Sequence, residues 1–337
     1  MFTTFILVAL FIGLLLASAV LWAFFLQFGL RWARVSNVTM GRVVVAAALV
    51  TAMQIVLNSL FQFAFPDSAP VIAGPCLLML GVLMQCALIK VVFRLNLRQT
   101  IQAWLPTLSA IALTAAIDFI VRASLYQAFF LPTNAMAPTL VARHLQGVCP
   151  ECKRPNYGSP VDARKGSHGL HKMICDNFHV AEVSGVDART YACDRFMVGK
   201  FVTPRRWDMI VFRYPAKPEL LYVKRLVGLP GETIQIRDGS VWADGQKLTP
   251  PEQIADIKYL DEIPEWPQSS LWGSANRPAV LGDDEFFVLG DFSAQSTDSR
   301  SWESGAATHS PFAVPESHIV GVVTHTFWPP SRFRVHR

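Results

Sequence analysis

The chain has 337 residues, of which 52% are hydrophobic and only 16% are charged, and its formal net charge is +5. Soluble domains are about 25% charged, so this composition argues against a wholly soluble protein. The sequence contains no basic run with interleaved aromatic residues, and it therefore indicates no nucleic-acid partner.

Four long uncharged stretches occupy the N-terminal part of the chain. Residues 1–30, 43–66, 68–89 and 99–117 contain no charged side chain. Each stretch approaches or exceeds the roughly 20 residues that a helix needs to cross a bilayer. The first is too long for the core of a signal peptide, and it ends without a small-residue cleavage site. The sequence therefore predicts four transmembrane helices, with residues 1–130 as the anchor in the lipid bilayer.

Positive residues are confined to two of the three loops between these stretches. The first loop contains Arg31, Arg34 and Arg42, and the third contains Lys90, Arg94 and Arg98. The second loop offers only Asp67. Because positively charged loops stay in the cytoplasm, we expect a multi-pass protein of the cytoplasmic (inner) membrane, with everything after the fourth span extracytoplasmic.

From about Leu131 onwards, prolines, glycines and charged residues occur throughout, and short β-like runs replace the apolar stretches. These runs cover residues 195–202, 209–213, 221–227, 233–237, 240–243, 286–289 and 318–327. Asp238-Gly239, between two of them, is a strong hairpin signal. We predict a mainly β domain over residues 131–337, with an insertion at about 145–193 and a loop or second insertion at 252–285.

Four stretches in this part of the chain form an ordered set. They are LPTNAMAPTL at 131–140, DRFMVGK at 194–200 followed by DMIVFRY at 208–214, YVKRLVGLPGE at 222–232, and LGDFSAQSTDSRSW at 289–302. Together they resemble signal peptidase I, the membrane-bound Ser–Lys leader peptidase family. The resemblance implies removal of signal peptides from exported preproteins at the outer membrane face, by chemistry that needs no metal.

The resemblance assigns roles to five positions outside the nucleophile. Lys224 matches the general base, which acts only if burial lowers its pKa towards neutrality. Ser296 matches the residue that orients this lysine, and Thr133 matches the oxyanion donor. Asp298 and Arg300 match a structural salt bridge, although a surface ion pair of little energetic value is also consistent with the sequence.

The position of the family's nucleophilic serine is Ala135. A methyl group cannot attack a carbonyl, so normal acylation is unavailable to this chain. In an extended segment Thr133 would share a face with Ala135, but as a substitute nucleophile it would be displaced by several ångströms. The other residues that match the family's site are kept, which is consistent with a deliberate inactivating substitution at position 135. This retention is equally consistent with a catalytically inactive pseudoprotease that binds signal peptides or a partner in the same groove.

Four further residues depart from the family pattern. Phe292 replaces the usual Asn and Ser293 the usual Arg, whereas Trp207 and Glu303 each replace a Gly. The Ser-x-Asp-Ser-Arg core of the fourth stretch is intact.

The insertion contains a cluster of cysteines with metal-ligand spacing. Cys149 and Cys152 form a CxxC knuckle, and Cys175 follows with His179 close behind it. Three thiolates and one imidazole make a complete tetrahedral zinc set, with His171 and Cys193 as alternatives to His179 for the fourth ligand. Disulfides are the competing prediction, because the outer compartment is oxidising. A third interpretation makes this insertion the functional part and the β domain its scaffold.

Overall fold

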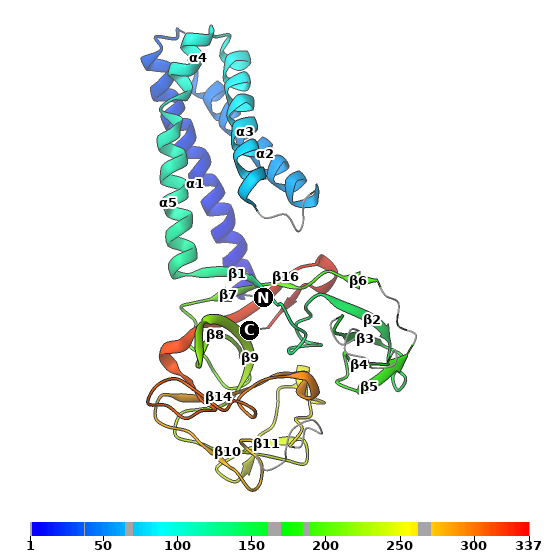
Figure 1. Cartoon of the computed structure of the whole chain (residues 1–337). Helices are drawn as coiled ribbons and strands as arrows, with labels where there is room; N and C mark the ends of the chain where they lie inside the picture. Colours follow the sequence, from blue (N-terminus) through cyan, green and yellow to red (C-terminus); the bar gives the residue numbers. More distant parts are fainter. Residues whose placement is uncertain are drawn as a thin grey trace. The chain divides into compact units, whose positions relative to one another are not determined.

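The structure, a computed structural model, divides the chain into two compact units, residues 1–121 and 122–337 (Figure 1). It describes residues 2–36, 38–64, 70–160, 170–184, 186, 189–261 and 271–336. The sequence analysis placed the domain boundary after residue 130. The observed boundary is earlier because β1 (Tyr126–Phe130) pairs with β7 (Arg195–Gly199) and so belongs to the β unit.

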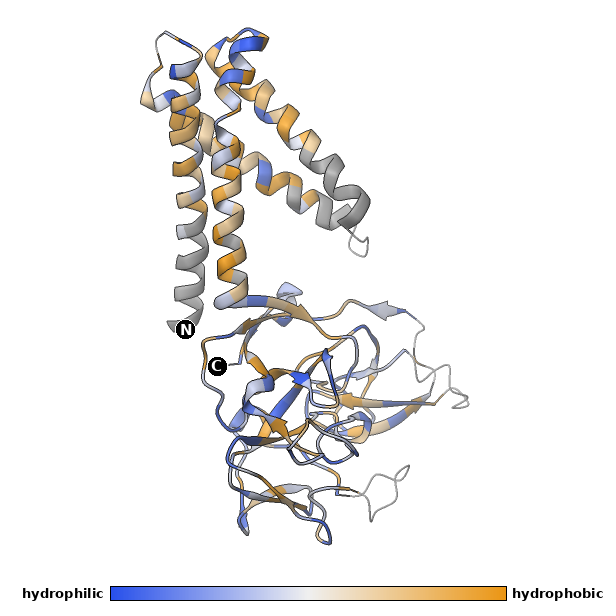
Figure 2. Cartoon of the chain, turned by 60° about the vertical axis from the view of Figure 1, so that its left-hand side comes forward, coloured by the Kyte–Doolittle hydropathy of each residue, from blue (hydrophilic) through white to orange (hydrophobic). Residues whose placement is uncertain are grey.

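The first unit is helical. Its helices are α1 (Phe2–Trp32), α2 (Met40–Ala64), α3 (Pro70–Phe93), α4 (Leu97–Trp104) and α5 (Thr107–Ser124). The described parts of these helices are predominantly hydrophobic (Figure 2). Among the described residues, three segments rather than the predicted four are long and apolar enough to cross a membrane: Leu15–Trp32, Met40–Leu57 and Leu97–Val121. Within the predicted third span, the described apolar helix Met79–Phe93 is shorter.

The predicted fourth span is built from two helices. Pro106 lies between α4 and α5, where a missing N–H and a ring clash interrupt the helical hydrogen-bond ladder. At the start of α4, Asn96 and Gln99 form a capping box. Helix α1 approaches α4 closely at Gly29, where a Cβ would lie 2.2 Å from the carbonyl oxygen of Ala103.

The second unit consists of three antiparallel sheets. The largest has the order β1-β7-β16-β8-β9-β14-β15, with β17 paired to β16. Its other strands are β8 (Met209–Tyr214), β9 (Lys217–Gly228), β14 (Glu285–Leu289), β15 (Val314–Pro315), β16 (Ile319–Trp328) and β17 (Arg334–Val335). The second sheet has the order β12-β11-β10-β13, from β10 (Thr233–Arg237), β11 (Ser240–Ala243), β12 (Gln246–Lys247) and β13 (Ala279–Val280).

The third sheet is the insertion. It has the order β5-β4-β3-β2-β6, from β2 (His144–Val148), β3 (Pro155–Gly158), β4 (Leu170–Cys175), β5 (Val180–Ser184) and β6 (Thr190–Tyr191). None of these strands is apparent in the sequence as an apolar run. We call this third sheet the inserted sheet.

The seven predicted strands are confirmed, and so is the mainly β architecture. Asp238 and Gly239 join β10 to β11 with φ values of 48° and 73°, the paired positive angles of a two-residue hairpin turn. The stretch 252–285, predicted as a loop or an insertion, contributes to the core in its described part. Buried Ile254, Ile257 and Tyr259 pack into the core of the second sheet, and β13 lies within the same stretch.

Candidate active site

Lys224 is buried in the middle of the largest sheet. It lies on β9 opposite Ile210 of β8 and is only 4% exposed. Its Nζ donates a hydrogen bond of 3.0 Å to Ser296 Oγ. Burial lowers the pKa of Lys224 to about 8, and the carboxylates of Asp298 and Asp291 oppose this shift without cancelling it. A substantial fraction of this amine is therefore neutral near pH 8.

Ala135 lies against the loop that carries Ser296. The carbonyl oxygen of Ala135 accepts a hydrogen bond of 3.1 Å from the backbone N–H of Phe292. A Cβ on Gly290 would lie 2.0 Å from Ser296 Oγ and 2.7 Å from Ala135 O, so both atoms flank this glycine. A side chain at position 290 would push the two segments apart. The nucleophile position and the lysine's hydrogen-bond partner are thus brought together.

The segment around Ala135 is a turn and not the extended strand considered above. The backbone N–H of Ala137 bonds to Asn134 O, and the Asn134 side chain accepts a hydrogen bond of 2.8 Å from Ala142 N. Asn134 and Ala135 are buried, whereas Thr133 is exposed. The extended conformation in which Thr133 would share a face with Ala135 is therefore not observed. The oxyanion role of Thr133 stays a prediction.

Asp298 and Arg300 form an ion pair that is buried, with at most 1% of either side chain exposed. The interpretation of this pair as a surface ion pair is wrong. Burial alone would raise the pKa of Asp298, but the charge and hydrogen bonds of Arg300 hold that pKa below its ordinary value. Asp298 also accepts from Gly290 N, and Arg300 donates to Ser293 Oγ and Leu260 O. The pair therefore fixes both ends of the loop that carries Ser296.

A second buried ion pair, which the sequence analysis did not identify, joins this loop to β9. Arg225, next to Lys224, donates from Nε and Nη2 to the two carboxylate oxygens of Asp291 at 2.7 and 2.5 Å. Thr139 Oγ1 donates to the same carboxylate at 2.5 Å. The pair thus connects the strand of the lysine, the loop of Ser296 and the segment after Ala135. The only signal for it in the sequence is that both residues lie inside the family-like stretches.

Trp207 shows why the family pattern has a glycine at this position. Its φ of 72° lies in the left-handed region, which glycine adopts without strain. Its N–H donates to Leu226 O, and its carbonyl oxygen accepts from Arg225. The tryptophan keeps the backbone conformation that holds the segment containing Lys224.

Phe292 lies on the loop that carries Ser296, which we call the active-site loop, and it contacts the inserted sheet. It is fully buried and packs with Tyr157 and Ile174 of the inserted sheet and with Phe178. An asparagine at position 292 would bury an amide in this apolar cluster, which is unfavourable. Because the inserted sheet forms part of the cluster, the insertion explains why phenylalanine replaces the asparagine of the family pattern.

The predicted metal ligands come together at one end of the inserted sheet. The ligating atoms of Cys149, Cys152, Cys175 and His179 all lie within 4.8 Å of one another. His171 and Cys193, considered as alternative ligands, are not members of this group.

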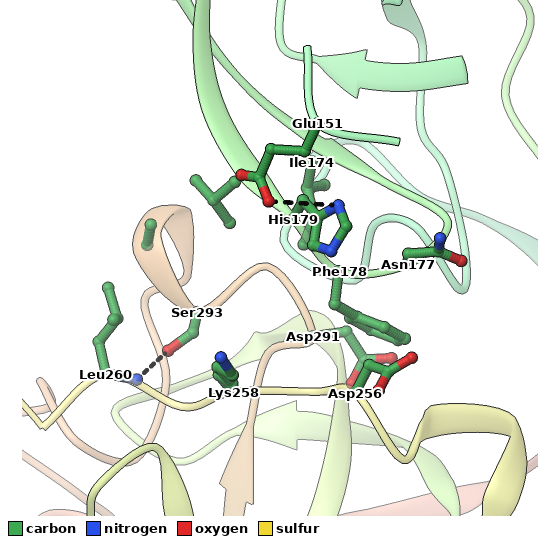
Figure 3. Close-up of a pocket in the computed structure, with 12 residues that line it drawn as sticks. Glu151, Ile174, Asn177, Phe178, His179, Asp256, Lys258, Leu260, Asp291 and Ser293 are labelled. Atoms are coloured by element: carbon green, nitrogen blue, oxygen red, sulfur yellow. Dashed lines mark hydrogen bonds and ion pairs between the residues drawn. The ribbon is translucent and has the colours of Figure 1, made fainter. Parts of the chain in front are cut away.

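A cavity of about 470 Å³ lies between the inserted sheet and the active-site loop (Figure 3). Phe178 and His179 line it from one side, and Asp291 and Ser293 line it from the other. Its lining does not include Lys224. The cavity therefore belongs to the junction between the insertion and the loop.

Comparisons with known proteins identify the family of this chain. The profile of the family described as "Signal peptidase, peptidase S26" matches residues 101–328. A signal peptidase I from Leptolyngbya laminosa is 35% identical over 151 residues, which cover 41% of this chain and 62% of that protein. A probable signal peptidase I-1 from Synechocystis is 32% identical over 155 residues, which cover 42% of this chain and 65% of that protein.

Solved structures are similar as well. A crystal structure of a signal peptidase I from Enterococcus faecalis V583 is 26% identical, covers 36% of this chain and 98% of its own, and superposes with a TM-score of 0.27. The family profile alone spans more than half of the chain. The chain belongs to the signal peptidase family, peptidase S26.

Proposed function

We propose that this chain has the active site of a signal peptidase I acting on exported preproteins, with the attacking hydroxyl missing. The observation that carries the proposal is Lys224, buried with a lowered pKa and hydrogen-bonded to Ser296. Ser296 Oγ and the carbonyl oxygen of Ala135, the nucleophile position, flank the same glycine, Gly290. Such an environment is costly for a lysine that serves only structure, whereas it suits a general base.

The chemistry can be written for a serine at position 135. Neutral Lys224 would take the hydroxyl proton as the oxygen bonds to the scissile carbonyl carbon. The resulting ammonium would give that proton to the leaving amine as the C–N bond breaks. The same amine would then take a proton from a water molecule as the water oxygen bonds to the ester carbon. The ammonium would return that proton to the serine oxygen as the ester C–O bond breaks, which regenerates the hydroxyl and the neutral amine. With Ala135 the first bond cannot form, and the chain retains only binding.

The test is to restore the hydroxyl. Loss of the nucleophile in another serine protease costs on the order of 10⁶ in turnover, so Ala135→Ser should raise cleavage of a preprotein by several orders of magnitude. Ala135→Ser combined with Lys224→Ala should remain as inactive as the unmodified chain. Cleavage by the unmodified chain that Thr133→Val abolishes would mean that Thr133 is a substitute nucleophile.

A second candidate function is that of a pseudoprotease, and it is favoured by the same alanine. If Ala135→Ser binds a signal peptide but does not cleave it, the groove has diverged from catalysis. Binding of a fluorescent signal peptide to both chains, measured in detergent, separates this outcome from a folding failure.

The membrane topology is part of the proposal. The basic loops around Arg34 and Arg94 support a protein of the cytoplasmic membrane with both loops inside. The β unit is outside if α3 crosses the membrane in addition to the three membrane-length segments, although its described apolar part, Met79–Phe93, is shorter than theirs. Reporter fusions after Asp67 and Gly239 should report the outer side, and a fusion after Asn96 should report the cytoplasm. A cytoplasmic signal from the Gly239 fusion would overturn this topology.

A further inference from the structure

The inserted sheet brings two turns to the same end. Strands β2, β3, β4 and β5 are consecutive and antiparallel neighbours, so the β2–β3 and β4–β5 connections lie on the same side of the sheet. The first connection carries Cys149 and Cys152, and the second begins at Cys175 and ends at His179. Each turn therefore supplies two potential metal ligands.

The two turns differ by one residue in length, but each closes with a backbone hydrogen bond to its first cysteine and contains one left-handed residue. Lys153 N donates to Cys149 O in the first, and Phe178 N donates to Cys175 O in the second, at 3.0 and 2.8 Å. Lys153 and Phe178 have φ values of 61° and 60°, a left-handed conformation that costs a non-glycine residue about 1 kcal/mol or more. Both strained residues lie next to a ligand candidate, so the strain serves to aim the ligands.

The distances fit a metal better than a disulfide. Cys152 Sγ and Cys175 Sγ are 3.6 Å apart. Two thiolates on a tetrahedral zinc, with Zn–S bonds of about 2.3 Å, are separated by about 3.8 Å, whereas a disulfide bond is about 2.05 Å long. Cys149 Sγ lies 3.9 Å from His179 Nδ1. Glu151 approaches the same nitrogen only to 3.6 Å, beyond a good hydrogen bond.

From this geometry we propose that the two turns bind one zinc ion, and that the ion fixes the contact between the inserted sheet and the active-site loop. The ligands are Cys149, Cys152, Cys175 and His179. Three sulfur donors and one imidazole select zinc over cations that prefer oxygen. The buried thiols of Cys149 and Cys175 close the inner side of the site, and half-buried His179 closes the outer side.

Phe178 transmits the effect of the ion. It lies between two ligands, and its ring packs against the cluster that contains Phe292 and against the core of the second sheet. Phe292 lies on the same loop as Ser296, the hydrogen-bond partner of Lys224. The zinc thus acts as a structural clamp on the loop, and it takes no part in bond cleavage. This inference rests on the cysteine turns and is independent of the proposed function.

The metal content of the full chain, purified in detergent, tests the site directly. We expect about one zinc per chain, and replacement of zinc by cobalt should give the strong visible absorption of a tetrahedral thiolate site. Cys149→Ser and Cys175→Ser should each lose most of the bound zinc. Cys193→Ser, a cysteine outside the cluster, is the matched control and should retain it.

Hydrogen exchange tests the clamp without using activity or a variant. Removal of zinc by a chelator should accelerate exchange in the peptide that covers residues 286–296, and added zinc should reverse the change. The paired strands β1 and β7, whose core cluster contains neither Phe178 nor Phe292, should exchange equally in both states.

Two results would overturn the proposal. A chain without zinc or cobalt after incubation with either metal, and with Cys152 and Cys175 joined in a disulfide, would show that the site is a disulfide site. Stoichiometric zinc without any change of exchange at residues 286–296 on its removal would show that the ion does not clamp the loop.

Discussion

The polar groups around Lys224 and those in the cysteine turns of the inserted sheet find their partners in different ways. Around Lys224 the buried charges are paired within the chain, Arg225 with Asp291 and Arg300 with Asp298. The cysteine turns instead bring three cysteine sulfurs and one imidazole within 4.8 Å of one another, a set that the proposed zinc ion would complete. A catalytic region can therefore keep its geometry after its nucleophile is lost, since its scaffold does not involve that group. The proposed clamp would depend on a zinc ion, a component from outside the chain.

The largest effect is expected on breaking the ion pair between Arg225 and Asp291. Asp291→Asn should lower the free energy of unfolding by about 3–5 kcal/mol, because a buried arginine is left without its charge partner. The half-buried pair of Arg206 and Glu232 is the control. Glu232→Gln should cost about 1 kcal/mol or less. Denaturant unfolding of the full chain in detergent, followed by near-UV circular dichroism, measures the free energy of unfolding of both variants. Equal decreases in the two variants would contradict the special importance of the Arg225–Asp291 pair.

The next largest effect concerns pH in the Ala135→Ser chain. The base works as the neutral amine, so cleavage should rise as the pH increases through the pKa of Lys224, about 8. The neutral fraction of such an amine grows about fiftyfold between pH 6 and pH 8 and levels off above pH 9. The rate of preprotein cleavage at saturating substrate measures this profile. A flat profile between pH 6 and pH 8 would remove Lys224 from the role of base.

A smaller effect is expected from Ser296→Ala in the same Ala135→Ser chain. Loss of the 3.0 Å hydrogen bond to Nζ should lower turnover roughly tenfold and leave KM unchanged, as expected of a positioning residue. The midpoint of the pH profile should stay near 8, since burial is the main cause of the lowered pKa.

The matched control for this variant is Ser299→Ala. Ser299 Oγ accepts a hydrogen bond from Val288 N and does not contact Lys224. Its replacement should reduce stability without a comparable loss of turnover. Equal losses of turnover in both variants would mean that Ser296 acts only through the stability of the loop.

The sequence predicted the central strands because they are runs of β-branched and aromatic residues between turn signals. Lys224 could be identified because the stretch around it resembles the general-base stretch of the family, whereas a lysine next to Arg225 is by itself more often a solvated charge. The inserted sheet could not be predicted, because β2 and β3 are short, contain glycine and proline, and form around the cysteine turns. The Arg225–Asp291 pair and the packing of Phe178 on Phe292 join segments far apart in the chain. No local pattern reports such contacts.

The central claim is that the base survives without the nucleophile, and the titration of Lys224 in the unmodified Ala135 chain tests it most directly. The Cε resonance of labelled lysine, assigned with Lys224→Arg, can be followed by NMR as the pH is raised. The account predicts a midpoint near 8, unchanged in Ala135→Ser, because the burial of Lys224 does not depend on residue 135. A midpoint near the ordinary lysine value of about 10.4 would contradict it.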